Sequence, residues 1–253
     1  MSAIYETEKL VSEYLFFHYG SPEEILPPDR PWPVGMQDAL DFPCRTPRHF
    51  SSHTAKRGLD LGCAVGRSTF EMARACEEVI GIDFSHAFIR TAETLRTGGG
   101  IPYSRLEEAA IRTPLIAKAP GGINVSSIRF QQGDAMNLPE SIGTFDRVHA
   151  ANLLCRLPEP LRLLKRLPSL INPGGELVLA TPCTWLEEFT PPTNWPETTT
   201  LDWLKQHLSP HFQLLREAAE PFLIRETARK FQWTTSLVTV WKRRSAGVPT
   251  GTI

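Results

Sequence analysis

Short apolar runs alternate with amphipathic segments along most of the chain. Because apolar runs bounded by turn residues are typical of buried strands, we predict strands at residues 57–61, 78–83, 127–132, 145–151 and 177–182. Apolar residues at helical spacing predict helices at residues 68–76, 86–95, 160–167 and 201–208. Segments 211–216 and 232–241 have high β propensity and are predicted to complete the sheet. This order indicates an α/β fold with a doubly wound, mostly parallel, seven-stranded sheet whose last strand is antiparallel.

A helix and a proline-rich segment precede this core. Apolar and aromatic residues at helical spacing predict a helix over residues 5–19. Prolines recur through residues 21–47, where we expect neither regular helix nor sheet. The chain is therefore divided into an N-terminal helix and proline-rich cap (1–50), an α/β domain (51–244) and a tail (245–253). The stretch 98–127, longer than a minimal connection, has no functional interpretation.

A glycine turn follows the first strand of the core. Asp60 precedes Gly62 and Gly66, and Asp83 ends the next strand. Glycines let the backbone approach a ligand closely, and an acid about 20 residues further on is where nucleotide-binding folds hold ribose hydroxyls. Dinucleotide sites require Gly-x-Gly-x-x-Gly, whereas this turn has Gly-x-x-x-Gly with Ala64 in the middle. An adenosyl group is therefore expected, and a dinucleotide is disfavoured.

Two later turns extend this pattern. Gly133-Asp134-Ala135 follows the third strand and Asn152 follows the fourth, at the edge where open α/β sheets bind ligands. Together with the glycine turn, they resemble the cofactor motifs of class I S-adenosylmethionine-dependent methyltransferases. The resemblance implies a Rossmann-like methyltransferase domain at 51–244 with S-adenosylmethionine as its cofactor. The residues that it assigns to the cofactor are Asp60, Gly62, Cys63, Ala64, Gly66, Arg67, Asp83, Phe84, Ser85, Asp134, Ala135 and Asn152.

The composition of the chain argues against several other classes of function. The 253 residues carry a net charge of −1, so we expect no basic surface for nucleic acid or for an anionic membrane. We see no apolar run near the length of a membrane span and no signal-peptide pattern, and we therefore expect a cytoplasmic protein. The five cysteines form no C-x-x-C pair and the histidines are scattered, so we expect reduced thiols and no metal site.

Segments outside the cofactor motifs resemble a more specific group of methyltransferases. Tyr5–Gly20 (YETEKLVSEYLFFHYG), Asn152–Pro158 (NLLCRLP) and Phe222–Trp233 (FLIRETARKFQW) resemble the methyltransferases of ovothiol synthesis. Those proteins are described as 4-mercaptohistidine (5-thiohistidine) N-methyltransferases, and they occur as separate chains or as a domain of a larger sulfoxide synthase. The resemblance implies methyl transfer to an imidazole nitrogen of 5-thiohistidine, giving ovothiol A and S-adenosylhomocysteine. It also implies a functional link to a sulfoxide synthase.

Such a reaction sets requirements for the site. An imidazole nitrogen is nucleophilic only when unprotonated, so the site needs a base or surroundings that favour the neutral ring. His18 and Glu226 are the candidates for this role, and Asn152 is expected beside the transferred methyl. The amino acid substrate needs an arginine for its carboxylate and aromatic walls for its ring. The candidate substrate-binding residues are Tyr14, His18, Tyr19, Arg45, Asn152, Trp185, Arg225, Glu226 and Arg229.

Three other functions fit part of the sequence. The core motifs equally suit a methyltransferase for a different small acceptor. Assaying a panel of substrates would distinguish that enzyme from a thiohistidine methyltransferase. A nicotinamide-dependent dehydrogenase is disfavoured by the glycine spacing. A non-catalytic partner of the sulfoxide synthase would bind the cofactor without turning over any thiol-imidazole.

Overall fold

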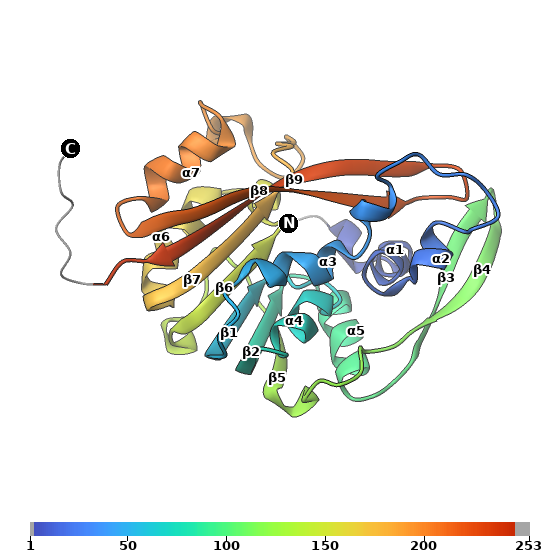
Figure 1. Ribbon diagram of the computed structural model, residues 1–253, viewed down its shortest axis with the longest axis horizontal. Helices are drawn as coiled ribbons and strands as arrows, with labels where there is room; N and C mark the ends of the chain where they lie inside the picture. The colour runs from blue at the N-terminus through green and yellow to red at the C-terminus, as the bar shows by residue number, and fades with distance from the viewer. Residues whose placement is uncertain (1–2, 246–253) are drawn as a thin grey trace.

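The computed structural model describes residues 3–245, and the rest of the predicted tail lies outside the described residues. The elements alternate along the chain as the apolar pattern predicts (Figure 1). The helices are α1 (Glu8–Tyr19), α2 (Pro22–Ile25), α3 (Phe42–Arg45), α4 (Arg67–Met72), α5 (His86–Arg96), α6 (Pro160–Leu170) and α7 (Thr200–Leu208). The strands are β1 (Ala55–Leu61), β2 (Cys76–Asp83), β3 (Ile101–Glu108), β4 (Ile111–Ala117), β5 (Ile128–Gln132), β6 (Phe145–Ala151), β7 (Ile171–Thr181), β8 (Phe212–Arg225) and β9 (Phe231–Arg243).

Within residues 3–245, the main sheet has seven strands in the order β5-β2-β1-β6-β7-β9-β8 (Figure 1). Strand β1 pairs in parallel with β2 and β6, and β6 pairs in parallel with β7. Strand β9 runs antiparallel to both β7 and β8. The predicted seven-stranded, mostly parallel sheet is therefore confirmed, and its antiparallel last strand lies between β7 and the edge strand β8.

The central strands are apolar because both faces of the sheet are covered. Leu59 and Leu61 of β1 are fully buried in one core cluster with apolar residues of α6 and α7. On the other face, Val178 and Ala180 of β7 pack in a second cluster with residues of the segment before β1. None of the helices in residues 3–245 is both long enough and apolar enough to cross a membrane.

Two local predictions are corrected by the structure, and one stretch without a prediction is now described. Helix α4 ends at Met72, earlier than predicted, because β2 already begins at Cys76. The proline-rich segment contains helical turns: Pro22 stands in the first turn of α2, where its missing N–H costs nothing. The stretch 98–127 forms a two-stranded hairpin of β3 and β4, with its own antiparallel register.

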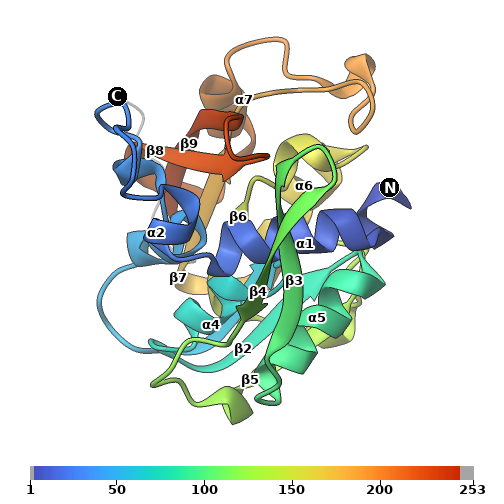
Figure 2. The ribbon, with the colours of Figure 1, turned by 90° about the vertical axis from the view of Figure 1, so that its right-hand side faces the viewer.

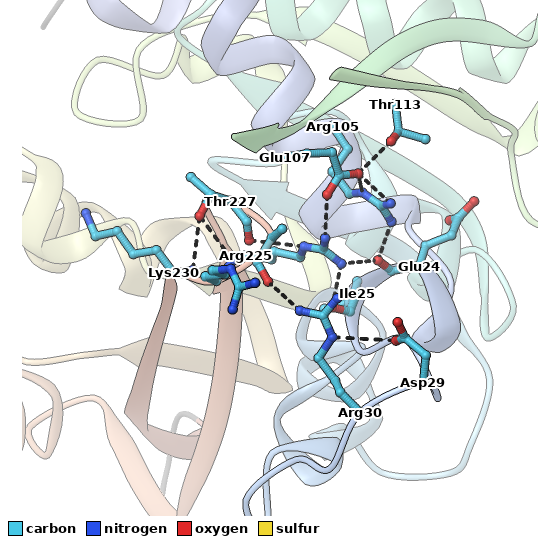
Figure 3. Close-up of polar contacts among 12 residues, drawn as sticks. Glu24, Ile25, Asp29, Arg30, Arg105, Glu107, Thr113, Arg225, Thr227 and Lys230 are labelled. Atoms are coloured by element: carbon cyan, nitrogen blue, oxygen red, sulfur yellow. Dashed lines mark hydrogen bonds and ion pairs between the residues drawn. The ribbon is translucent and has the colours of Figure 1, made fainter. Parts of the chain in front are cut away.

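This β3–β4 hairpin lies against α1 and reaches the tip of the β8–β9 hairpin (Figure 2). The Glu107 carboxylate accepts hydrogen bonds from the guanidinium groups of Arg105 and Arg225, at 2.7 and 2.8 Å (Figure 3). Both arginines also donate to the backbone carbonyl of Glu24. We call Arg105, Glu107 and Arg225, with the Glu24 carbonyl, the hairpin clamp. It joins three segments that are far apart in the sequence.

Candidate active site

A cavity of about 880 Å³ opens at the carboxyl edge of the sheet. Helix α1 supplies one wall, and the tip of the β8–β9 hairpin supplies another. Its floor comes from the loops that follow β1, β2, β5 and β6. The lining residues that carry the following argument are Tyr5, Tyr14, His18, Gly62, Ala64, Asp83, Phe84, Ser85, Ala135, Asn152, Arg156, Glu226 and Lys230.

The glycine turn after β1 has a backbone that few residues tolerate. Gly62, Ala64 and Gly66 all have positive φ, at 70°, 47° and 90°. A Cβ on Gly66 would lie 2.6 Å from Cζ of Phe130, so a side chain there would both strain the backbone and clash. Gly62 and Ala64 line the cavity, whereas Gly66 shapes the turn from behind. The turn therefore presents bare backbone to a ligand.

Asp83 stands beside this turn with its carboxylate fixed. One oxygen accepts from the backbone N–H of Ala64 and the other from that of Ser85, both at 2.9 Å. Burial raises the pKa of Asp83 to about 6. Phe84, which also lines the cavity, is 42% exposed and offers an aromatic face. A sterically bare turn, a fixed acid and an open aromatic ring fit the adenosine part of the expected cofactor.

The N-terminal segment is tied over this region. Ser85 caps α5 through the N–H of Phe88, and its hydroxyl donates to the carbonyl of Tyr5. The Glu6 carboxylate accepts from the first backbone N–H groups of α5, those of His86 and Ala87. These bonds hold the start of the N-terminal segment against the loop that carries Asp83.

Five predicted cofactor residues are not among the residues that line the cavity: Asp60, Cys63, Gly66, Arg67 and Asp134. Asp60 is 1% exposed and accepts hydrogen bonds from Ser68 and Thr69, and its other oxygen lies 2.7 Å from Nδ1 of His149. It therefore fixes the start of α4. Ala135, which follows Asp134, does line the cavity. Direct cofactor contact by these five stays a prediction.

His18 brings an uncharged imidazole to the cavity. Burial, which disfavours the imidazolium, lowers the pKa of His18 to about 3. Its Nδ1 is buried without a hydrogen-bond partner among the described residues. Tyr14 lies one helical turn earlier, with ring centroids 5.8 Å apart. The ring of His18 is thus neutral at physiological pH and has hydrogen-bonding capacity that the chain itself does not use.

Asn152 lies at the end of β6 in a left-handed conformation, with φ of 53°. Its backbone N–H donates to Ala180, and its Oδ1 accepts from the hydroxyl of Ser236 at 2.8 Å. Ser236 is fully buried in β9. Because its carbonyl is engaged, the side chain of Asn152 has its amide Nδ2 left to donate to a ligand.

Glu226 also lines the cavity, but it is already paired. Its carboxylate accepts from Lys230 and from Gln232, both at 2.5 Å. These bonds, that of Lys230 first, lower the pKa of Glu226. Glu226 therefore stays ionised at neutral pH and is poorly suited to store a proton.

Five predicted substrate residues do not line the cavity. Tyr19 donates its hydroxyl to Val65, and Trp185 donates its indole N–H to Thr200. The remaining three are arginines: Arg45 is bound by Glu220 and by the Pro221 carbonyl, Arg225 belongs to the hairpin clamp, and Arg229 is exposed. Substrate binding by these five residues stays an untested prediction.

Sequence reasoning missed Arg156, which does line the cavity. Its position was a usable signal, because it stands in the same loop as Asn152, on the ligand side of the sheet. Exposed Lys230 and half-buried Tyr5 were also missed, since neither stands in a distinctive sequence pattern.

Comparisons with known proteins agree with this geometry. The profile of a methyltransferase domain matches residues 39–235. A demethylmenaquinone methyltransferase from Lactococcus lactis is 29% identical over 53% of this chain and 45% of its own length. A trans-aconitate 2-methyltransferase from Deinococcus radiodurans is 30% identical over 49% of this chain and 37% of its own. The chain thus spans less than half the length of these curated relatives.

Solved structures show the same fold at low sequence identity. The N-methyltransferase NodS from Bradyrhizobium japonicum, in complex with S-adenosyl-L-homocysteine, superposes with a TM-score of 0.54 and 14% identity. That match covers 93% of this chain and 99% of NodS. Since the profile match spans well over half of the sequence, the chain belongs to the methyltransferase domain family and has the fold of its S-adenosylmethionine-dependent members.

Proposed function

We propose that this protein transfers a methyl group from S-adenosylmethionine to an imidazole nitrogen of 5-thiohistidine, forming ovothiol A. One observation carries the proposal. The three segments that resemble ovothiol methyltransferases, residues 5–20, 152–158 and 222–233, are far apart in the sequence, yet each contributes lining residues to the same cavity. The likeness outside the cofactor motifs is thus concentrated where an acceptor would bind.

The cofactor would supply an activated methyl on a positively charged sulfur. Asp83 would hold the ribose hydroxyls, and Ala135 would contact the adenine ring. The protein must then align the acceptor nitrogen with the methyl and exclude water. The aromatic residues Tyr14, Phe17 and Phe222 in the cavity wall suit a flat ring and keep the site apolar.

Proton balance explains why a strong base is unnecessary. A thiohistidine that reacts as its thiolate, with a neutral imidazole, has one ring nitrogen with a free lone pair. Attack by that pair forms the N–C bond, the C–S bond of the sulfonium breaks, and the sulfur keeps the electron pair. The product is a thiolate–imidazolium zwitterion, and no proton is transferred in the step. The ring must be neutral and held in the right orientation.

His18 is suited to that task. With a pKa of about 3 it does not take up a proton near neutral pH, but as a neutral ring it can hydrogen-bond the acceptor imidazole. The Nδ2 of Asn152 can donate to the thiolate and leave a ring nitrogen for the methyl. We therefore assign His18 and Asn152 to orientation, and Glu226, which stays ionised, to the substrate's ammonium group.

Mass spectrometry tests the proposal. The protein is incubated with S-adenosylmethionine and reduced 5-thiohistidine, with histidine in a parallel reaction. A gain of one methyl on thiohistidine alone is expected. His18→Ala should lower kcat by about ten- to a hundredfold, as loss of a hydrogen bond to a reacting group does. His211→Ala, an exposed histidine outside the cavity, should not.

Two results would contradict the proposal. Methylation of both compounds would indicate a general histidine methyltransferase. No product from either, with S-adenosylhomocysteine binding confirmed by calorimetry, would point to another acceptor or to a non-catalytic role.

A further inference from the structure

Three basic residues line the cavity, and one of them differs from the other two. Lys9 lies 3.9 Å from the carboxylate of Glu13, and Lys230 is paired with Glu226. Among residues 3–245, Arg156 has no carboxylate within ion-pair distance. Arg156 is therefore the one of these three basic residues that no acidic group of the described residues neutralises.

The guanidinium of Arg156 is nevertheless held in place. Its Nη1 donates to the carbonyls of Cys155 and Thr184, at 3.2 and 3.1 Å. The guanidinium carbon lies 4.8 Å from the centroid of the Phe189 ring, a cation–π contact. Neither Nε nor Nη2 has a hydrogen bond within the described residues. The group is thus oriented by neutral partners and keeps donors for a ligand.

Charge and position together indicate the ligand. Arg156 is half-buried, and the exposed acid on the same wall, Glu188, does not pair with it. A half-buried guanidinium that is fixed in orientation can bind a carboxylate with two parallel N–H···O bonds. The loop of Arg156 and the segment of Phe189 are separate from the glycine turn, Asp83 and Ala135, which fit the cofactor.

We propose that Arg156 binds the carboxylate of the methyl acceptor and so restricts the enzyme to amino acid or other carboxylate acceptors. This inference rests on the proposed function and adds to it a specificity residue. It is an alternative to the three arginines that the sequence suggested, two of which are held by the chain's own groups and one of which is exposed outside the cavity.

Two pairs of ligands, each with and without a carboxylate, test the inference. The acceptors are 5-thiohistidine and its decarboxylated analogue, 5-thiohistamine. The cofactor pair is S-adenosylhomocysteine and 5′-methylthioadenosine, which lacks the amino acid part. KM, kcat and calorimetric Kd are measured for wild type, Arg156→Gln and Arg156→Lys. Arg162→Gln, on the exposed side of α6, is the matched control.

We expect Arg156→Gln to raise the KM for thiohistidine by about ten- to a hundredfold, the range for a charged hydrogen-bonded contact, with little change in kcat. The KM for thiohistamine and the Kd of both cofactor ligands should stay the same. Arg156→Lys should recover part of the loss, because it keeps the charge without the fork. Arg162→Gln should behave as wild type.

Two outcomes overturn the inference. An equal rise in KM for both acceptors would mean that Arg156 does not bind the carboxylate. Weaker binding of S-adenosylhomocysteine, with methylthioadenosine unchanged, would assign Arg156 to the carboxylate of the cofactor.

Failure of the proposed function gives a different result. Wild type would then turn over neither acceptor. The readout becomes the calorimetric Kd of each acceptor for the protein saturated with S-adenosylhomocysteine. A preference for thiohistidine over thiohistamine that Arg156→Gln removes would still support the arginine. Equal binding, or no binding, of the two would overturn it.

Discussion

Glu107→Gln is the substitution whose consequence the structure defines most clearly. Glu107 is the carboxylate of the hairpin clamp, and the side chain of Arg225 beside it is only 2% exposed (Figure 3). One Glu107 oxygen accepts from Arg105 and from Thr113, and the other accepts from Arg225. A glutamine keeps the shape but removes the negative charge, which leaves two guanidinium groups facing each other without an acid.

The expected loss follows from burial. Removing one partner of a fully buried ion pair costs about 3–5 kcal/mol. The side chain of Glu107 is 18% exposed, and Arg225 keeps its bonds to the carbonyls of Glu24 and Ile25. We therefore expect a smaller loss, about 2–3 kcal/mol, which lowers Tm by about 5–10 °C in a domain of this size.

Urea unfolding measures this loss, with the midpoint compared at constant m. Glu93→Gln is the matched control, because Glu93 pairs with Arg96 one turn away in α5 and its side chain is 42% exposed. Such a surface pair is worth about 0.5 kcal/mol or less. If Glu107→Gln loses no more stability than Glu93→Gln, the clamp does not fasten the hairpin tip and the reasoning is refuted.

Three further predictions concern the cavity itself. Gly66→Ala should abolish S-adenosylhomocysteine binding through its clash with Phe130, whereas Gly98→Ala, which shares the positive φ but meets nothing within 4 Å, should cost only about 1 kcal/mol of stability; calorimetry and urea unfolding compare the two. Because burial raises the pKa of Asp83 to about 6, protonation should weaken cofactor binding up to tenfold per pH unit below pH 6, and Asp83→Asn should remove this dependence in a calorimetric pH series. Ser236→Ala should free the amide of Asn152 and lower kcat about tenfold at unchanged cofactor Kd, while Thr239→Val, which removes a buried hydroxyl without a partner on the same strand, should not; steady-state kinetics would contradict this if the two variants behaved alike.

The sheet could be predicted because its signals are local. Runs such as Leu59–Leu61 are apolar because both faces of a parallel sheet are buried, and a turn like that at Gly62 requires residues with little or no side chain. The β3–β4 hairpin could not be predicted in the same way. Its strands are only half-buried and their polar residues bond to distant segments, so the stretch lacks a clean alternation.

The candidate site was predictable where a residue follows a strand. Asp83, Ala135 and Asn152 line the cavity because the carboxyl ends of parallel strands meet at one edge. Side chains that depend on tertiary pairing were not predictable. Arg225 and Arg156 look alike in the sequence, but Glu107, more than a hundred residues away, binds the first, and nothing in residues 3–245 neutralises the second.

The most direct test of the account is the position of the transferred methyl. A thiolate sulfur competes with the ring nitrogens as a nucleophile, so the site must direct the attack. S-adenosylmethionine labelled with ¹³C at the methyl is turned over with 5-thiohistidine, and the carbon NMR spectrum distinguishes N-methyl from S-methyl. The account predicts a single N-methyl product that requires the protein. An S-methyl product, or no labelled product with the cofactor bound, would contradict it.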